Sequence, residues 1–150
     1  MAITTIRNST FIADAVNYIK NKLNTNITDP LSGGRPPTDK FILTEYPMKP
    51  VKYPIITVKD AGSAQEMRLG MRSESTMLRI PIEIRIWTRN VVERDELFDS
   101  VYDYLRTNQF SGDDFQGAEL HDFKMSSAVN VSEGGTRSKV MEVSYLFIAE

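Results

Sequence analysis

The fold is decided by residues 77–89, which read MLRIPIEIRIWTR. Every second residue from position 78 is aliphatic: Leu78, Ile80, Ile82, Ile84 and Ile86. Successive side chains of a β-strand point to opposite faces, so a strand would gather these residues on one side. A helix would scatter them around its circumference. The stretch therefore predicts a two-faced strand whose aliphatic face packs on a core.

The residues that follow predict a helix able to cover this aliphatic face. Asn90 suits the N-cap position, and Glu93 lies three residues later, close to a capping box. An apolar stripe continues to about Thr107 through Leu97, Phe98, Val101, Tyr104 and Leu105. The charged residues between positions 93 and 103 are expected on or near the opposite face. Buried apolar area stabilises by roughly 25 cal/mol per Å², so this contact should contribute strongly to stability.

A second helix is expected over residues 5–24. Its apolar stripe is formed by Ile12, Ala15, Val16, Ile19 and Leu23. Asp14 and the two lysines near the end of the helix are expected largely off that stripe. The early acid and the late lysines also suit the helix dipole.

Residues 26–40, NITDPLSGGRPPTDK, predict an irregular loop, because paired glycines and paired prolines break regular structure. A loop of this length is usually functional or disordered. Gly33, Gly34 and Arg35 could cradle an anion, but the sequence lacks the phosphate-binding pattern of P-loops, which disfavours that reading. Two readings stay open: a plain mobile loop, or a loop that orders against a neighbouring subunit.

Five further stretches predict strands: residues 41–46, 55–59, 65–72, 118–131 and 139–149. The third should form an antiparallel hairpin with residues 77–89, and Gly134 and Gly135 should form the turn between the last two. Alternate residues from His121 to Val131 are expected to share a face. Apolar residues on both faces of the final stretch suggest a central strand, or a strand whose outer face is covered by another subunit. Together these elements predict one α+β domain: a mostly antiparallel sheet of about four to six strands with two main helices on one face.

Composition narrows the class of protein. The 150-residue chain is 41% hydrophobic and 25% charged, which is ordinary for a soluble domain. No apolar run approaches the roughly 20 residues that span a bilayer, and no signal peptide is expected, so membrane partners are not predicted. Absent cysteines exclude disulfides and thiolate metal sites and fit assembly in a reducing cytosol. A net charge of −2 argues against a dedicated duplex-DNA binder.

The sequence shows no catalytic, cofactor or metal motif. His121 is the only histidine, and no nucleophile or carboxylate stands in a recognisable arrangement with it. Asp113 and Asp114 lack the spacing of a calcium-binding loop. The acidic residues of the second helix are typical of a solvated face. An enzyme is therefore not expected.

The other face of residues 77–89 is a candidate subunit or partner interface. It carries Arg79, Glu83, Arg85 and Trp87, and the preceding strand adds Arg68 and Arg72. Tryptophan and arginine are favoured at protein interfaces. The alternative is an exposed face stabilised by cross-strand ion pairs. A solvated face rarely needs a tryptophan, which favours the interface.

The order of these elements resembles that of the tail-terminator and tail-completion proteins of long-tailed bacteriophages, including lambda-like siphophages. The resemblance covers most of the chain and is carried by YPIITVKDAG (53–62), RIPIEIRIWTRN (79–90), VVERDELFDSVYDYLR (91–106) and KVMEVSYLFIAE (139–150). Its most specific part is the Y-P-x-I stretch followed by the strand–helix segment Ile80 to Arg106.

The resemblance implies a structural virion protein, assembled in the host cytoplasm and located at the tail or neck. Such subunits form a ring, commonly a hexamer, that caps the tail tube, ends its polymerisation and presents a surface to the head connector. DNA would pass through the lumen without specific binding. Gly33, Gly34, Arg35, Gly134 and Gly135 would lie in loops that contact the tube protein or the connector.

Other classes of protein stay open. No residue distinguishes a terminator from head-closure and other neck proteins, which also form rings of small subunits. A non-viral cytosolic binding module could use the same sheet face. A hydrolase is disfavoured by the missing nucleophile–histidine–acid arrangement.

Overall fold

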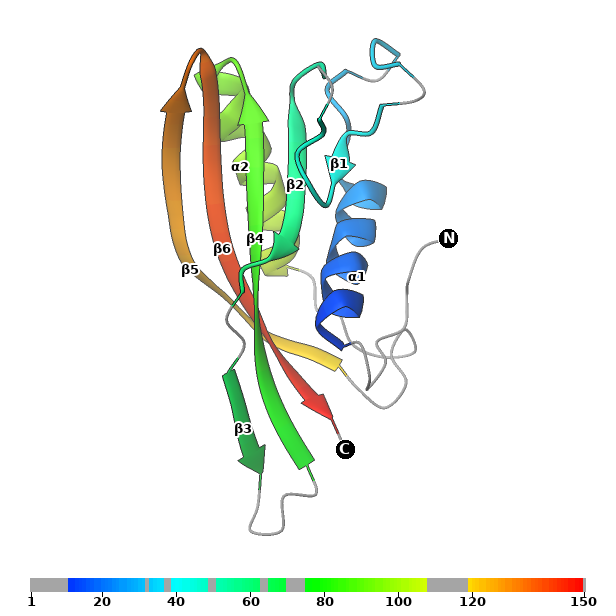
Figure 1. Cartoon of the computed structure of the whole chain (residues 1–150), viewed down its shortest axis with the longest axis vertical. Coiled ribbons are helices and arrows are strands. Elements are labelled where there is room, and N and C mark those ends of the chain that lie inside the picture. Colours follow the sequence, from blue (N-terminus) through cyan, green and yellow to red (C-terminus); the bar gives the residue numbers. More distant parts are fainter. Residues whose placement is uncertain are drawn as a thin grey trace.

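The computed structural model describes residues 11–31, 33–36, 39–48, 51–62, 65–69, 75–107 and 119–149. Its elements, in chain order, are α1 (Phe11–Asn26), β1 (Ile42–Leu43), β2 (Ile55–Asp60), β3 (Gln65–Leu69), β4 (Ser75–Thr88), α2 (Val91–Thr107), β5 (Glu119–Glu133) and β6 (Thr136–Ala149) (Figure 1). The predicted α+β class is confirmed. The expected first turns of α1 lie outside the described residues.

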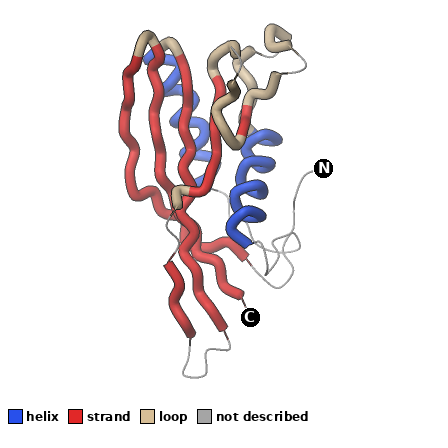
Figure 2. Tube along the Cα trace, viewed as in Figure 1, coloured by secondary structure: helices blue, strands red, loops and turns tan. Residues whose placement is uncertain are grey.

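The six strands form one sheet in the order β1-β2-β4-β6-β5, with β3 paired to β4 off this path. All neighbours are antiparallel except β1 and β2. Two strands pair with the same edge of β4: β2 pairs with residues 82–87, and β3 pairs with residues 75–79. The β3–β4 hairpin therefore extends beyond the part of the sheet that the helices flank (Figures 1 and 2).

The aliphatic face of β4 is sealed, as the alternation predicts. Ile80, Ile82, Ile84 and Ile86 are fully buried and belong to one core cluster with residues of both helices. α1 packs on β1, β2 and β4, while α2 packs on β4 and β6. The inner faces of the two neighbouring strands complete this core through Ile56, Val58, Met141 and Val143. Both helices thus lie on one side of the sheet.

The predicted N-cap of α2 is confirmed. The side-chain oxygen of Asn90 accepts hydrogen bonds from the backbone N–H groups of Val92 (2.8 Å) and Glu93 (3.4 Å). These bonds satisfy two donors that the first turn of a helix otherwise leaves unpaired. The cap ends β4 and directs the chain back across the sheet within a few residues.

Two charged residues expected on exposed helix faces are instead buried. Arg94 stands three and four residues before Leu97 and Phe98, so helical spacing places it beside the core. Its aliphatic stem is covered while its guanidinium contacts Asp95 at 3.1 Å. Asp14 of α1 is also buried. Both expectations were wrong because each apolar stripe is broader than its most hydrophobic residues indicate.

The expectation that alternate residues from His121 to Val131 share one face of the sheet is also wrong. Register shifts occur between His121 and Lys124 and again between Met125 and Ser127. Each β-bulge adds a residue to one strand and exchanges the faces that follow. Met125 consequently lies opposite the core residue Val143, whereas Val129 lies opposite Val140 on the other face. The Gly134–Gly135 turn, with φ of +52° and +86°, and the central position of β6 are confirmed.

Within the described ranges, neither helix combines the length and the apolar character needed to cross a membrane.

Candidate subunit interface on the open face of the sheet

The face of the sheet opposite the helices carries the residues that the sequence singles out. Among the residues that the structure describes, no helix or second sheet packs over this side, which we call the open face. Cross-strand pairing assembles it from β2, β4 and β6, with these described side chains: Ile55, Thr57, Lys59, Arg79, Pro81, Glu83, Arg85, Trp87, Ser138, Val140, Glu142, Ser144 and Leu146. Four of them are buried, namely Ile55, Thr57, Pro81 and Ser138, and all the others except Lys59 are half-buried.

Trp87 is held in place by its own chain. Its indole Nε1–H donates to the hydroxyl of Thr57 on β2 at 3.1 Å. The ring of Tyr46, from the segment between β1 and β2, packs against the indole with centroids 4.6 Å apart. Trp87 is nevertheless only half-buried. An aromatic side chain that is fixed but partly exposed can anchor a partner at small entropic cost.

Arg85 is fixed beside it. The guanidinium carbon lies 3.7 Å from the centre of the Trp87 ring, a cation–π contact. The same guanidinium donates to the hydroxyl of Ser138 on β6, from Nη2 at 3.0 Å and from Nε at 3.3 Å. Ser138 is buried and donates in turn to the carbonyl of Val131 on β5. Arg85 therefore links three strands and keeps its charge on the open face.

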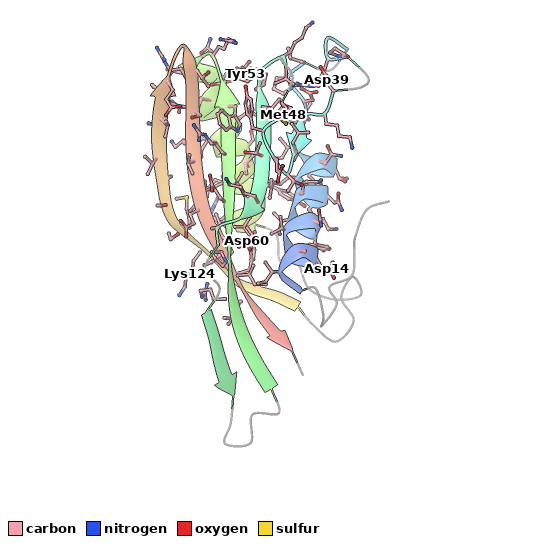
Figure 3. The ribbon with its side chains drawn as sticks, viewed as in Figure 1. Asp14, Asp39, Met48, Tyr53, Asp60 and Lys124 are labelled. Carbon is pink, nitrogen blue, oxygen red and sulfur yellow. The ribbon has the colours of Figure 1, made fainter. Side chains whose placement is uncertain are left out.

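Two tyrosines extend this group toward the end of the sheet. The hydroxyl groups of Tyr46 and Tyr53 lie 2.6 Å apart, and their hydrogen bond raises the pKa of Tyr46. Arg89 lies over the Tyr53 ring at 4.9 Å. We call Arg85, Trp87, Tyr46, Tyr53 and Arg89 the arginine–aromatic cluster. Tyr53 and the fully exposed Met48 lie on the segment that leads into β2 (Figure 3).

The remainder of the open face is held by polar pairs. Glu83 forms an ion pair with Lys59 at 3.6 Å, and Arg79 donates to the hydroxyl of Ser144 at 2.9 Å. Glu83 also lies directly opposite Glu142 in the β4–β6 register. Such exposed pairs contribute little to stability, so this region matches the alternative of a solvated, ion-paired face. Among the residues predicted for the interface, Arg85 and Trp87 therefore match an interface better than Arg79 and Glu83 do.

The side chain of Arg35, which was expected in a partner-contacting loop, is bound by its own chain, and the partner contact of this loop stays a prediction. Its side chain is only 5% exposed and forms an ion pair with Asp29, with Nε 2.7 Å from Oδ2. Its guanidinium also donates to the carbonyls of Lys52 (2.8 Å) and Pro54 (2.6 Å). The hydrogen bond from Arg35 lowers the pKa of Asp29. Arg35 thus ties the 26–40 loop to the start of β2.

The glycines of the expected contact loops are exposed. Gly33 has a φ of +87°, and Gly34 donates its N–H to the carbonyl of Leu31 at 2.7 Å. Gly134 and Gly135 form the β5–β6 turn at the same end of the sheet as Arg89. Their proposed partner contacts stay predictions. The side chain of Arg68 and all of Arg72 lie outside the described residues.

Catalytic or metal-binding arrangements gain no support from the described part of the chain. No group of His, Asp and Glu side chains there could hold a metal ion. His121 pairs with Leu146 in the β5–β6 register, its side chain is not described, and Asp113 and Asp114 lie outside the described residues. Two shallow depressions lie along α2. One is on the outer face of the helix near Tyr102, and the other is between Pro30 and the first turns of the helix.

Sequence reasoning missed the residues that support Trp87 and Arg85. Thr57 of β2 lies opposite Arg85 and Ser138 of β6 lies opposite Trp87, so alternation could have found both once the register was known. Tyr46 and Tyr53 could not be found in this way, because they come from an irregular segment without periodicity. The Y-P-x-I stretch signalled only that this segment precedes a strand.

No protein-family model matches this chain, and neither does any curated protein sequence.

Proposed function

We propose that this chain is a structural subunit of a bacteriophage tail. In this proposal it forms a ring that caps the tail tube, ends tube polymerisation and provides the surface to which the head connector joins. The proposal rests on the resemblance in element order together with one structural observation. A sheet whose inner face is sealed by two helices leaves an open face on which a tryptophan and an arginine are fixed by contacts within their own chain.

The open face suits assembly more than catalysis. Buried interface cores are enriched in tryptophan, tyrosine and arginine, which are the residue types of the arginine–aromatic cluster. Because these side chains are already ordered, association costs little additional conformational entropy. A head-to-tail contact between this cluster and a different surface of the next subunit would close a ring.

Charge is compatible with the same role. The chain carries a net charge of −2. On the open face Lys59 pairs with Glu83, and the two arginines Arg79 and Arg85 donate to serine hydroxyl groups. A lumen without a basic surface would not retain phosphates, so DNA could slide through it. The tube protein and the head connector are the proposed partners, and the tail or neck of the virion is the proposed location.

Assembly should respond to the cluster more than folding does. Trp87→Ala and Arg85→Glu are each expected to weaken self-association at least about tenfold, the effect of losing an interface anchor. Light scattering after size exclusion, over a range of concentrations and with tube protein present, measures this association. Circular dichroism checks that both variants fold. Val92→Ala is the control, because it removes an exposed apolar side chain from the first turn of α2.

Several outcomes would contradict the proposal. A chain that stays monomeric even with tube protein would oppose a ring, and unchanged association in both variants would oppose the cluster as its interface. Electron microscopy of particles assembled without this chain then separates the roles. Overlong tails support a terminator, whereas full heads that leak DNA support the head-closure alternative.

A further inference from the structure

The strand β5 forms one edge of the sheet. β6 pairs with one side of it, and no strand among the described residues pairs with the other. Residues 124–130 are all exposed, and Val129 keeps 54% of its surface. Natural edge strands are usually protected by charged residues, prolines or bulges. Residues 127–132, SAVNVS, lie beyond the bulge at Ser126 and contain neither charge nor proline.

The hairpin geometry shows which backbone groups this edge presents. Glu133 and Thr136 flank the two-residue turn and form the first hydrogen-bonded pair, so bonded and non-bonded pairs alternate from there. The backbone groups of Ser127, Val129, Val131 and Glu133 therefore point toward β6. Those of Ala128, Asn130 and Ser132 point away from β6 at the free edge of the sheet, where another strand could pair with them.

This edge has a natural centre. The bulge at Ser126 limits it on one side and the turn at Gly134 limits it on the other. Residues 127–133 lie between these limits, and Asn130 is their midpoint. When a strand pairs antiparallel with a copy of itself, the two-fold axis lies between the two strands, so the residue at the centre of the pairing lies opposite the same residue of the partner.

We infer that a second copy of this chain pairs with β5 in antiparallel orientation, with Asn130 opposite Asn130 of the partner subunit. Ala128 then pairs with Ser132 of the partner subunit, and the reverse. Val129 lies opposite Val131 of the partner subunit on the open-face side of the sheet. Such β-branched cross-strand pairs are favourable, and both valines become covered.

Neighbouring registers are less favourable. Shifting the axis to Val129 places Val131 opposite Ser127 of the partner subunit. Shifting it to Val131 places Val129 opposite Glu133 of the partner subunit, which removes a carboxylate from water beside an apolar side chain. In the central register Glu133 faces a serine, so no valine meets a charge.

The resulting dimer should be weak and concentration-dependent. A pairing of this length buries less than the roughly 1,600 Å² of a standard interface. The contact uses the edge of the sheet and not the arginine–aromatic cluster. It therefore goes beyond the proposed ring, and either assembly could exist without the other.

Cysteine cross-linking tests the register directly, because the natural chain has no cysteine. An equal mixture of Val129→Cys and Val131→Cys should form disulfide dimers several-fold faster than either variant alone. In non-hydrogen-bonded antiparallel pairs the opposed Cα atoms lie about 4.5 Å apart, within disulfide reach. Val92→Cys, an exposed position on α2, gives the rate of random collision.

A backbone variant provides an independent readout. Asn130→Pro removes an N–H that points away from β6, so the chain should fold while cross-linking in the mixed experiment falls to the collision rate. Asn130→Thr is the control that keeps the N–H. Equal rates for the mixture and the single variants would overturn the inference, as would full cross-linking in the proline background. If the chain forms rings but this cross-linking does not occur, the pairing of β5 is contradicted and the proposed function is not.

Discussion

Replacing Ile84 with alanine is expected to lower the free energy of unfolding by about 2–5 kcal/mol. Ile84 is fully buried at the centre of β4, between Val58 of β2 and Met141 of β6. Both helices close this side of the sheet, so the surroundings cannot collapse into the space that the side chain leaves. Urea denaturation followed by far-ultraviolet circular dichroism measures the loss.

The adjacent position supplies a matched control. Glu83 stands next to Ile84 but faces the open side, where its described ion pair is with Lys59 at 3.6 Å. Glu83→Ala should change the unfolding free energy by less than about 1 kcal/mol, as for other exposed ion pairs. Similar losses in the two variants would contradict the two-faced character of β4.

Replacing Arg35 with alanine is expected to cost about 2–4 kcal/mol, a large effect for a residue in an irregular loop. The substitution leaves a carboxylate and two backbone carbonyls without the donor that now binds them. It also removes the guanidinium from the face of the Phe41 ring, 5.4 Å away. Thermal and urea unfolding should both report the loss.

The same variant should alter the dependence of stability on pH. The pKa of Asp29 is lowered in the folded chain, chiefly by the hydrogen bond from Arg35. A carboxyl group with a lowered folded pKa stabilises above its unfolded pKa of about 4, and this contribution is lost as pH falls through the folded value. Arg35→Ala should therefore lose less stability on acidification than the natural chain.

Lys40→Ala is the control for this effect, because Lys40 is an exposed cation of the same loop. It should leave the unfolding free energy and its pH dependence nearly unchanged. If both variants behave alike, the Arg35 contacts do not stabilise the loop.

The fold was predictable because its strongest signals are local. The alternation of β4 assigns each residue to a face without knowledge of its neighbours, and the structure buries Ile80, Ile82, Ile84 and Ile86 accordingly. The Asn90 cap and the stripe of α2 follow from helical geometry alone. The Gly134–Gly135 turn likewise needs only two adjacent residues with positive φ.

What could not be predicted depends on distant contacts. The bulges in β5 arise where that strand fits against β6, so the alternation of its own sequence does not reveal them. In the sequence Arg35 looks like an ordinary loop arginine. Only in the folded chain do Asp29 and the carbonyls before β2 surround it. The candidate interface was found only in part for the same reason. Arg85 and Trp87 follow from the parity of β4, whereas Tyr46 and Tyr53 depend on the path of an irregular segment.

The helices seal one face of the sheet, and we propose that assembly covers the other. Trp87 is the only tryptophan of the chain, so its fluorescence reports on the open face alone. Quenching by acrylamide should be measured for the dilute chain and for the chain assembled with tube protein. The quenching constant is expected to fall at least about twofold on assembly, because interface cores exclude water and small solutes. An unchanged quenching constant in the assembled particle would mean that assembly does not cover the open face.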